Sequence, residues 1–165
     1  MKEKNFKLPT FGVGPIFVLT CLCITLGGLY LDHNGYLNQG QVQDWEIIFN
    51  ILGLGLIALG LYLWIQAVIV EKINKQVQEG QLITNGVYGL VRNPVYSAFI
   101  FIFTGILFQR ANLILLILPV IFWIFLTLLM KATEEKWLRE KFGKDYEIYS
   151  AEVNRVIPWP RRKRK

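Results

Sequence analysis

Two polar residues, Arg92 and Asn93, and a proline, Pro94, stand at the start of a long apolar run. Asparagine can accept hydrogen bonds from the first free amides of a helix, and proline favours the first helical position, so these residues predict a helix start. A helix N-terminus beside an arginine can bind a carboxylate or a phosphate. An ordinary helix cap with an arginine at a membrane surface explains the same three residues equally well, and both explanations stay open.

An acidic pair, Glu134 and Glu135, follows the last long apolar stretch of the chain. The two last apolar stretches are joined by a short polar turn at 109–112, so we expect two antiparallel neighbouring helices. Glu134 should then face Pro94 near one membrane surface. A helix end that attracts anions and a pair of carboxylates would meet there, which favours a binding site over a simple cap.

The helix that carries the acidic pair is expected to run without a break from 113 until Gly143 ends it. Adjacent residues on a helix point about 100° apart, so one carboxylate should face the third helix and the other should face water or a basic neighbour such as Arg139. Pairing of Glu135 with Arg139 on a solvated face is the alternative. An aromatic and apolar stripe at helical spacing, suited to covering the site, follows at Leu138, Phe142, Tyr146, Tyr149 and Val153.

Four apolar stretches must position these residues. The chain has 165 residues, of which 53% are hydrophobic and 18% charged. An uncharged run of about 18 or more residues predicts a transmembrane helix, and the stretches lie at 11–31, 47–70, 94–108 and 113–130. At about 1.5 Å per residue the third reaches roughly 22 Å, less than a hydrocarbon core of about 30 Å. It therefore begins in a thinned bilayer or below the surface.

The distribution of charge predicts the topology. Of the 18 basic residues, only Arg110 falls on the opposite side from the others if all four stretches cross the membrane. The positive-inside rule then places both termini in the cytoplasm, in the plasma membrane if the chain is bacterial. We expect the terminal RRKRK to meet anionic lipid head groups, and we expect no nucleic acid as partner.

These patterns predict an all-α polytopic membrane protein, with 1–165 as a single membrane domain. It should contain four transmembrane helices, a short antiparallel hairpin of the third and fourth, and a cytoplasmic C-terminal helical segment. The elements of the site are expected at 80–96 and 131–159. No cluster of metal ligands is visible in the sequence, so we expect no metal.

Small residues recur at heptad spacing in the second stretch, at Gly53, Gly60 and Ala67, where another helix can approach closely. That partner is either a helix of the same chain or a second copy, and the oligomeric state stays open. Gln66 lies beside this stripe. We favour a hydrogen bond between helices for Gln66 over contact with a bound ligand.

Two segments together resemble a known family. LITNGVYGLVRNPVY, followed some 40 residues later by EEKWLREKFGKDYEIYSAEVNRVIPW, is similar to the C-terminal signature of the isoprenylcysteine carboxyl methyltransferase and phospholipid methyltransferase superfamily. The resemblance covers about 80–159. It implies an integral membrane enzyme that uses S-adenosylmethionine to methylate a prenylated or otherwise amphiphilic acceptor, such as a prenylcysteine-like carboxylate or a lipid amine. The alternatives are a non-enzymatic member of the fold and a small membrane reductase that binds NADPH.

The resemblance also implies roles for particular residues. The cofactor-binding positions fall on Tyr88, Arg92, Asn93, Pro94, Tyr96, Glu134 and Glu135, and the pattern favours Glu135 as the inward carboxylate. Candidates on the substrate side are Gln66, Tyr146, Tyr149 and Arg155. Arg92 is expected to bind the methionyl carboxylate and a glutamate the ammonium group or the ribose. The family usually has histidine where this chain has Asn93, and asparagine cannot act as a base near neutral pH.

Overall fold

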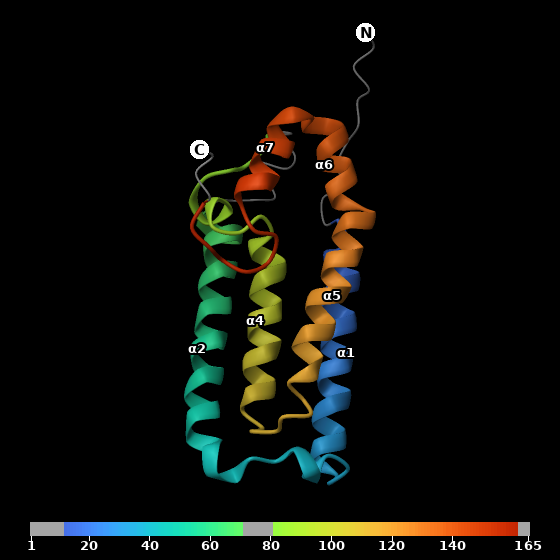
Figure 1. Ribbon diagram of the computed structural model, residues 1–165, viewed down its shortest axis with the longest axis vertical. Coiled ribbons are helices and arrows are strands. Elements are labelled where there is room, and N and C mark those ends of the chain that lie inside the picture. Colours follow the sequence, from blue (N-terminus) through green and yellow to red (C-terminus); the bar gives the residue numbers. More distant parts are fainter. Residues whose placement is uncertain (1–11, 71–80, 162–165) are drawn as a thin grey trace.

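The computed structural model describes residues 12–70 and 81–161, and helices dominate both parts (Figure 1). No strand occurs in these two ranges, so the all-α class is confirmed for them. The α-helices are α1 Gly14–His33, α2 Glu46–Ile65, α4 Pro94–Phe108, α5 Ile117–Ala132, α6 Glu134–Phe142 and α7 Lys144–Glu152. A π-helical turn, Gln66–Val70, extends α2.

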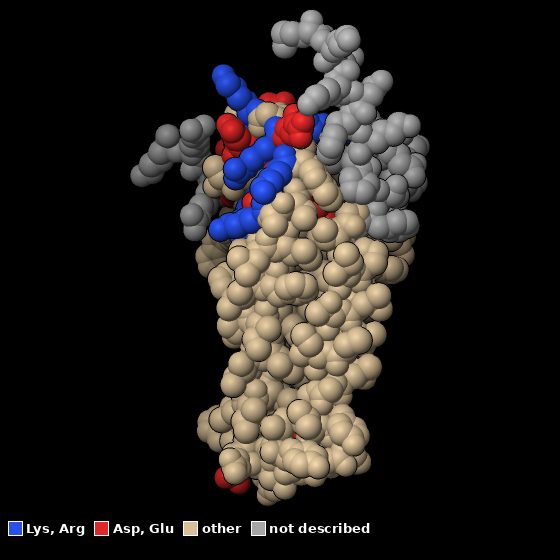
Figure 2. Space-filling view, turned by 90° about the vertical axis from the view of Figure 1, so that its right-hand side faces the viewer, with Lys and Arg blue, Asp and Glu red and all other residues tan. Residues whose placement is uncertain are grey.

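Three segments are long and apolar enough to cross a membrane: Gly14–His33, Gln43–Val70 and Ile117–Phe142. The helix α4 is apolar but shorter, so a fourth crossing stays a prediction. In Figure 1, α1, α2, α4 and α5 run side by side along the long axis, and α6 and α7 lie at one end. Figure 2 shows basic and acidic side chains gathered at that same end, above a long band without charge. This pattern is typical of a helix bundle that lies in a bilayer.

The helices α2 and α4 pack at close range because small residues meet along their contact. A Cβ atom added to Gly60 would lie 2.7 Å from the carbonyl oxygen of Ala98, and one on Gly105 would lie 2.5 Å from that of Gly53. The predicted small-residue stripe of α2 is therefore confirmed, with α4 as its partner. Because α4 already covers Gly53 and Gly60, a second copy cannot pack there in this arrangement.

A second contact surface joins α1, α4 and α5 through large apolar side chains. The ring of Phe17 on α1 stacks on Phe125, with 5.9 Å between centroids, and meets the edge of Tyr96 at 5.8 Å. The fully buried members of this core include Phe17, Cys21, Leu107, Phe122, Leu126 and Met130. The start of α4 is thereby held between α2 on one side and α1 with α5 on the other.

The expected unbroken helix from 113 to Gly143 was wrong at both ends of α5. Residues before Ile117 form a turn, in which the amide of Ile114 donates to the side-chain oxygen of Asn112. At Thr133 the backbone leaves the helix, with φ −128° and ψ −89°, and α6 begins at the next residue. The end at Gly143 was predicted correctly, and its φ of +52° suits glycine.

A buried carboxylate, that of Asp32, organises the end of the bundle opposite α6 and α7. Asp32 accepts hydrogen bonds from Arg110, Asn112 and Gln41, each at 2.7 Å. Asn112 also donates to the carbonyl oxygen of Leu37. This network ties the end of α1 and the following loop to the turn between α4 and α5. It therefore helps to hold α1 next to the α4–α5 hairpin.

Candidate active site at the start of α4

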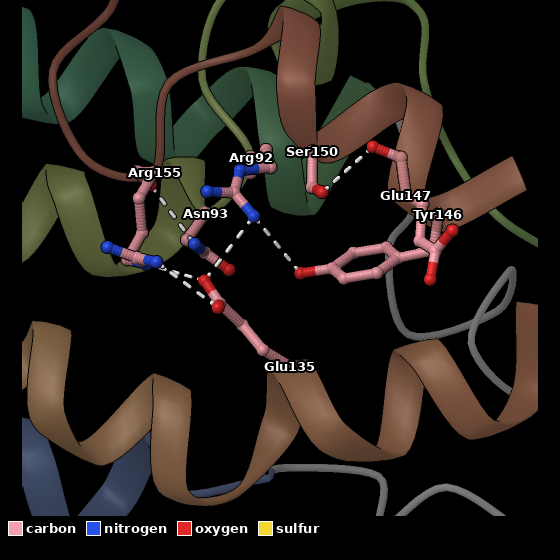
Figure 3. A network of polar contacts seen from close by, with 7 residues as sticks. All are labelled: Arg92, Asn93, Glu135, Tyr146, Glu147, Ser150 and Arg155. Carbon is pink, nitrogen blue, oxygen red and sulfur yellow. Dashed lines mark hydrogen bonds and ion pairs between the residues drawn. The ribbon is translucent and has the colours of Figure 1, made fainter. Parts of the chain in front are cut away.

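The centre of the site is the carboxylate of Glu135, which lies between two guanidinium groups (Figure 3). Its Oε1 is 3.3 Å from Nη1 of Arg92 and 2.5 Å from Nε of Arg155, and its Oε2 accepts from Nη2 of Arg155 at 3.1 Å. The side chain of Glu135 is 5% exposed, and those of Arg92 and Arg155 are 10% and 20% exposed. We call these three residues the Glu135 network.

The backbone around Arg92 is held by a segment that returns after α7. The amide of Arg92 donates to the carbonyl oxygen of Asn154 at 2.8 Å, and that of Trp159 donates to the carbonyl oxygen of Leu90 at 3.0 Å. A parallel bridge joins Val91 to Asn154. We call residues 153–159 the returning segment. Its pairing with the chain before α4 brings Arg155 to the same carboxylate as Arg92.

Asn93 occupies the N-cap position of α4 and Pro94 the first helical position, as predicted. The prediction that the Asn93 side chain caps free helix amides was wrong, since it makes no such hydrogen bond. Its Nδ2 instead donates to the carbonyl oxygen of Arg155 at 3.0 Å. The Ser97 hydroxyl lies 2.6 Å from the carbonyl oxygen of Val156 and secures the same segment one turn further along α4. Both residues thus hold the returning segment.

The predicted aromatic stripe folds into a small cluster beside the network. The buried members are Tyr146, Tyr149 and Val153, packed against Leu82, Leu138 and Phe142. Nη1 of Arg92 donates to the hydroxyl of Tyr146 at 3.2 Å, and the hydroxyl of Tyr149 donates to the carbonyl oxygen of Tyr88 at 2.7 Å. Burial raises the pKa of Tyr146 and of Tyr149, so both phenols stay protonated near neutral pH.

The two glutamates at the start of α6 point to different partners. One glutamate of the pair was expected to face water, but Glu134 does not. Its Oε1 accepts hydrogen bonds from the hydroxyl of Tyr96 at 2.5 Å and from the amide of Val13 at 2.8 Å. Glu135 does not form the alternative pair on a solvated face and is buried between Arg92 and Arg155. The break at Thr133 precedes both residues and turns α6 so that each reaches its partners.

The electrostatics of the Glu135 network leave one positive charge in excess, because two guanidinium groups surround one carboxylate. Nε of Arg92 is buried and has no hydrogen-bond partner within the described ranges. A buried donor without a partner costs free energy, and an anionic group is the partner that would satisfy it best. The arrangement is therefore suited to receiving a carboxylate.

The remaining predicted site residues lie outside this network. Tyr88 is buried in the 3₁₀ turn Gly86–Gly89, and Gln66 is half-buried at the start of the π-helical turn. Among the described residues, no group of three or more histidine, cysteine or acidic side chains is placed to hold a metal. No sequence signal marks Ser97 or Val13, because their partners lie in segments distant in the chain.

A helical bundle with apolar outer faces and a buried arginine–glutamate network at one end is the class of protein that these observations define. Residues 48–145 match the model of the phospholipid methyltransferase family, and the chain belongs to this family. The matched range includes Arg92 and Glu135 and ends before Arg155. The resemblance seen in the sequence is thereby confirmed.

Individual relatives agree with this assignment. The chain is 35% identical over 80 residues to a probable protein-S-isoprenylcysteine O-methyltransferase of Oryza sativa subsp. indica, covering 48% of this chain and 41% of the relative. It is 30% identical over 122 residues to the protein-S-isoprenylcysteine O-methyltransferase of Schizosaccharomyces pombe (strain 972 / ATCC 24843), covering 67% and 50%. The chain thus spans half or less of the length of these relatives. No solved structure matches it.

Proposed function

We propose that this protein transfers a methyl group from S-adenosylmethionine to an amphiphilic acceptor that resides in the membrane. The single observation that carries the proposal is the convergence of Arg92 and Arg155 on Glu135 in a chain of a methyltransferase family. Methyl transfer from a sulfonium needs alignment of two reactants and exclusion of water rather than a metal or a nucleophilic side chain. The buried Glu135 network suits such chemistry.

The charges of the network fit the methionyl end of the cofactor, which carries a carboxylate and an ammonium group on one carbon. Arg92 and Glu135 are adjacent groups of opposite charge, 3.3 Å apart, and can bind those two groups respectively. Nε of Arg92, which has no partner within 12–70 and 81–161, is a free donor for the carboxylate. The bound cofactor supplies an electrophilic methyl group, and the protein positions it.

The second guanidinium favours an acidic acceptor. Once Arg92 and Glu135 bind the cofactor, Arg155 is left with a positive charge that a carboxylate would balance and an ammonium group would not. A carboxylate is also nucleophilic without losing a proton, whereas a protonated amine needs a base. Asn93 cannot serve as that base, and the chain's one histidine, His33, lies at the far end of α1. We therefore place a prenylcysteine-like carboxylate ahead of a lipid amine.

We also propose that the site faces the cytoplasm. Almost all basic residues of the sequence lie on the side of α6 and α7 under the predicted topology, as the positive-inside rule requires. A basic C-terminal tail would add attraction to anionic lipid. That part of the proposal rests on sequence, since residues 162–165 lie outside the described residues.

The proposal is tested by titrating the full chain in nanodiscs with S-adenosylmethionine and, separately, with NADPH. We expect saturable binding of S-adenosylmethionine and none of NADPH; the reverse result would support a reductase and overturn the proposal. Methyl transfer is then assayed with a farnesylcysteine derivative and with a phosphatidylethanolamine as acceptors.

The variant Arg155→Gln separates the two acceptors. It should weaken use of the carboxylate acceptor at least tenfold, because losing a charge-assisted hydrogen bond costs about 1.5–3 kcal/mol. The matched control is Arg161→Gln, since Arg161 pairs with Glu152 on the surface. Equal activity of Arg155→Gln and wild type with the carboxylate acceptor would remove the assigned role of Arg155.

A further inference from the structure

The carboxylate of Glu134 joins three helices that are distant in the sequence. It comes from the first turn of α6, accepts the Tyr96 hydroxyl from the first turn of α4, and accepts the Val13 amide at the start of α1. The first amides of a helix lack partners within the helix, and a carboxylate there also interacts favourably with the helix dipole. Glu134 therefore stabilises the start of α1 from outside that helix.

Two glycines make this close approach possible. Gly12 has a φ of +50°, and a Cβ atom added there would overlap the carboxylate of Glu134. A Cβ atom on Gly14 would lie 3.3 Å from the ring of Tyr96. The backbone at the start of α1 is thus fitted to Glu134 and Tyr96, and the contact depends on residues from all three helices.

The same two helix starts, those of α4 and α6, are connected twice. One connection is the ion pair of Arg92 with Glu135, and the other is the hydrogen bond of Tyr96 with Glu134. Arg92 and Tyr96 lie on opposite sides of Pro94, and the glutamates are consecutive. The two connections therefore act in parallel, because each joins the same two helix starts.

The two connections differ in how a ligand affects them. A carboxylate that binds Arg92 competes directly with Glu135 and weakens the ion pair. The Tyr96–Glu134 hydrogen bond involves an uncharged hydroxyl that lies beside the start of α1 and is no part of the ion pair, so an anion at Arg92 leaves it in place. The second connection is then the one that keeps α4 and α6 in register while a ligand is bound.

We propose that Glu134 is a positioning residue, which holds α1, α4 and α6 together when ligand groups take Arg92 from Glu135. This replaces the direct contact with the cofactor that the family resemblance implies for Glu134. The effect on ligands rests on the function proposed above. The parallel action of the two connections does not, because it is a property of the protein without ligand.

The parallel action is tested by a double-mutant cycle of Tyr96→Phe and Glu135→Gln, measured as melting temperature in nanodiscs without ligand. Tyr96→Phe removes only the hydroxyl. We expect it to lower the melting temperature by about 2 °C in the wild type and by about 5 °C or more in Glu135→Gln, where the other connection is already weakened. Equal shifts in both backgrounds would overturn the proposal. Tyr62→Phe is the matched control, since Tyr62 is 51% exposed.

The positioning role is tested by the affinity for S-adenosylmethionine of two variants at Glu134. Glutamine keeps an oxygen that accepts both hydrogen bonds, so Glu134→Gln should bind within about threefold of wild type, whereas Glu134→Ala should bind about tenfold more weakly. A loss as large in Glu134→Gln as in Glu134→Ala would mean that the charge itself contacts the cofactor, and would overturn the positioning role. If wild type does not bind S-adenosylmethionine, the proposed function fails while the double-mutant cycle still decides the parallel action.

Discussion

Replacing Glu135 by glutamine removes the negative charge between two guanidinium groups and leaves the size of the side chain and one acceptor oxygen in place. In the unliganded protein, Arg92 and Arg155 would then be buried side by side without a counter-charge. A buried ion pair costs desolvation free energy as well as gaining attraction. The effect of the replacement on stability therefore depends on how deeply the two remaining charges are buried and on the hydrogen bonds that they keep.

At an effective dielectric constant of about 20, two unit charges separated by the 3.3 Å between Arg92 and Glu135 attract by roughly 5 kcal/mol. Most of this attraction offsets desolvation, but removing one partner generally costs about 3–5 kcal/mol because the other charge stays buried. Arg155 is 20% exposed and glutamine still accepts one hydrogen bond, so we expect the lower end of that range. A loss of about 3 kcal/mol corresponds to a melting temperature lower by about 6–12 °C for a chain of this size.

The assay is thermal unfolding of wild type and Glu135→Gln in the same nanodiscs, followed by tryptophan fluorescence. Glu152→Gln is the matched control: Glu152 pairs with Arg161 at 2.7 Å, but Arg161 is 44% exposed. Exposed pairs contribute about 0–1 kcal/mol, so the control should melt within about 4 °C of wild type. If Glu135→Gln had the same melting temperature as the control, the reasoning that Glu135 neutralises buried arginines would be refuted.

Three further predictions concern other parts of the molecule. Asp32→Asn should cost about 2 kcal/mol, measured as a lower melting temperature, because Arg110 loses its counter-charge; an unchanged value would contradict a structural role for this network. Gly60→Leu should separate α2 from α4 and cost about 1–3 kcal/mol by overpacking, whereas wild-type stability would show that the contact is loose. In a cysteine-free background, single cysteines in place of His33 and Lys144 should react with an impermeant reagent from outside and from inside respectively, and equal reaction from both sides would contradict the predicted topology.

Local sequence patterns were sufficient for the elements that carry their own boundary signals. The helix α4 has the predicted bounds, because Asn93-Pro94 starts it and the polar turn at 109–112 ends it. The small-residue stripe of α2 was recognised by spacing alone. The convergence of the α4 start with the acidic pair followed from a short hairpin, since a short turn forces two helices to run antiparallel.

Contacts between distant segments could not be predicted in the same way. Periodicity predicts which face of a helix is buried, but not which side chain from elsewhere in the chain meets it. The partners of Glu134 illustrate this limit, because Val13 is 121 residues away and contributes only its backbone amide. The break at Thr133 was equally invisible, since no glycine or proline marks it. The hydrogen-bond partner of the Asn93 side chain lies in the returning segment, which has no regular secondary structure of its own and so could not be placed from sequence.

The carboxylates of Asp32 and Glu135, both buried, show how the same kinds of interaction differ between the two ends of the bundle. Asp32 receives one hydrogen bond each from Arg110, Asn112 and Gln41, and its charge balances that of Arg110. Such a network is closed in the sense that its one carboxylate balances one guanidinium group, and it stabilises a loop.

The Glu135 network is not closed in this sense, since two guanidinium groups share one carboxylate and a buried nitrogen of Arg92 has no partner in the described ranges. Stability alone does not favour that arrangement, because apolar side chains of similar volume are often as stabilising as a buried ion cluster. An excess positive charge with an unused donor is instead what a site for an anionic group requires. The difference between the two networks is therefore the physical ground for the proposal that a ligand binds at the end that carries α6 and α7.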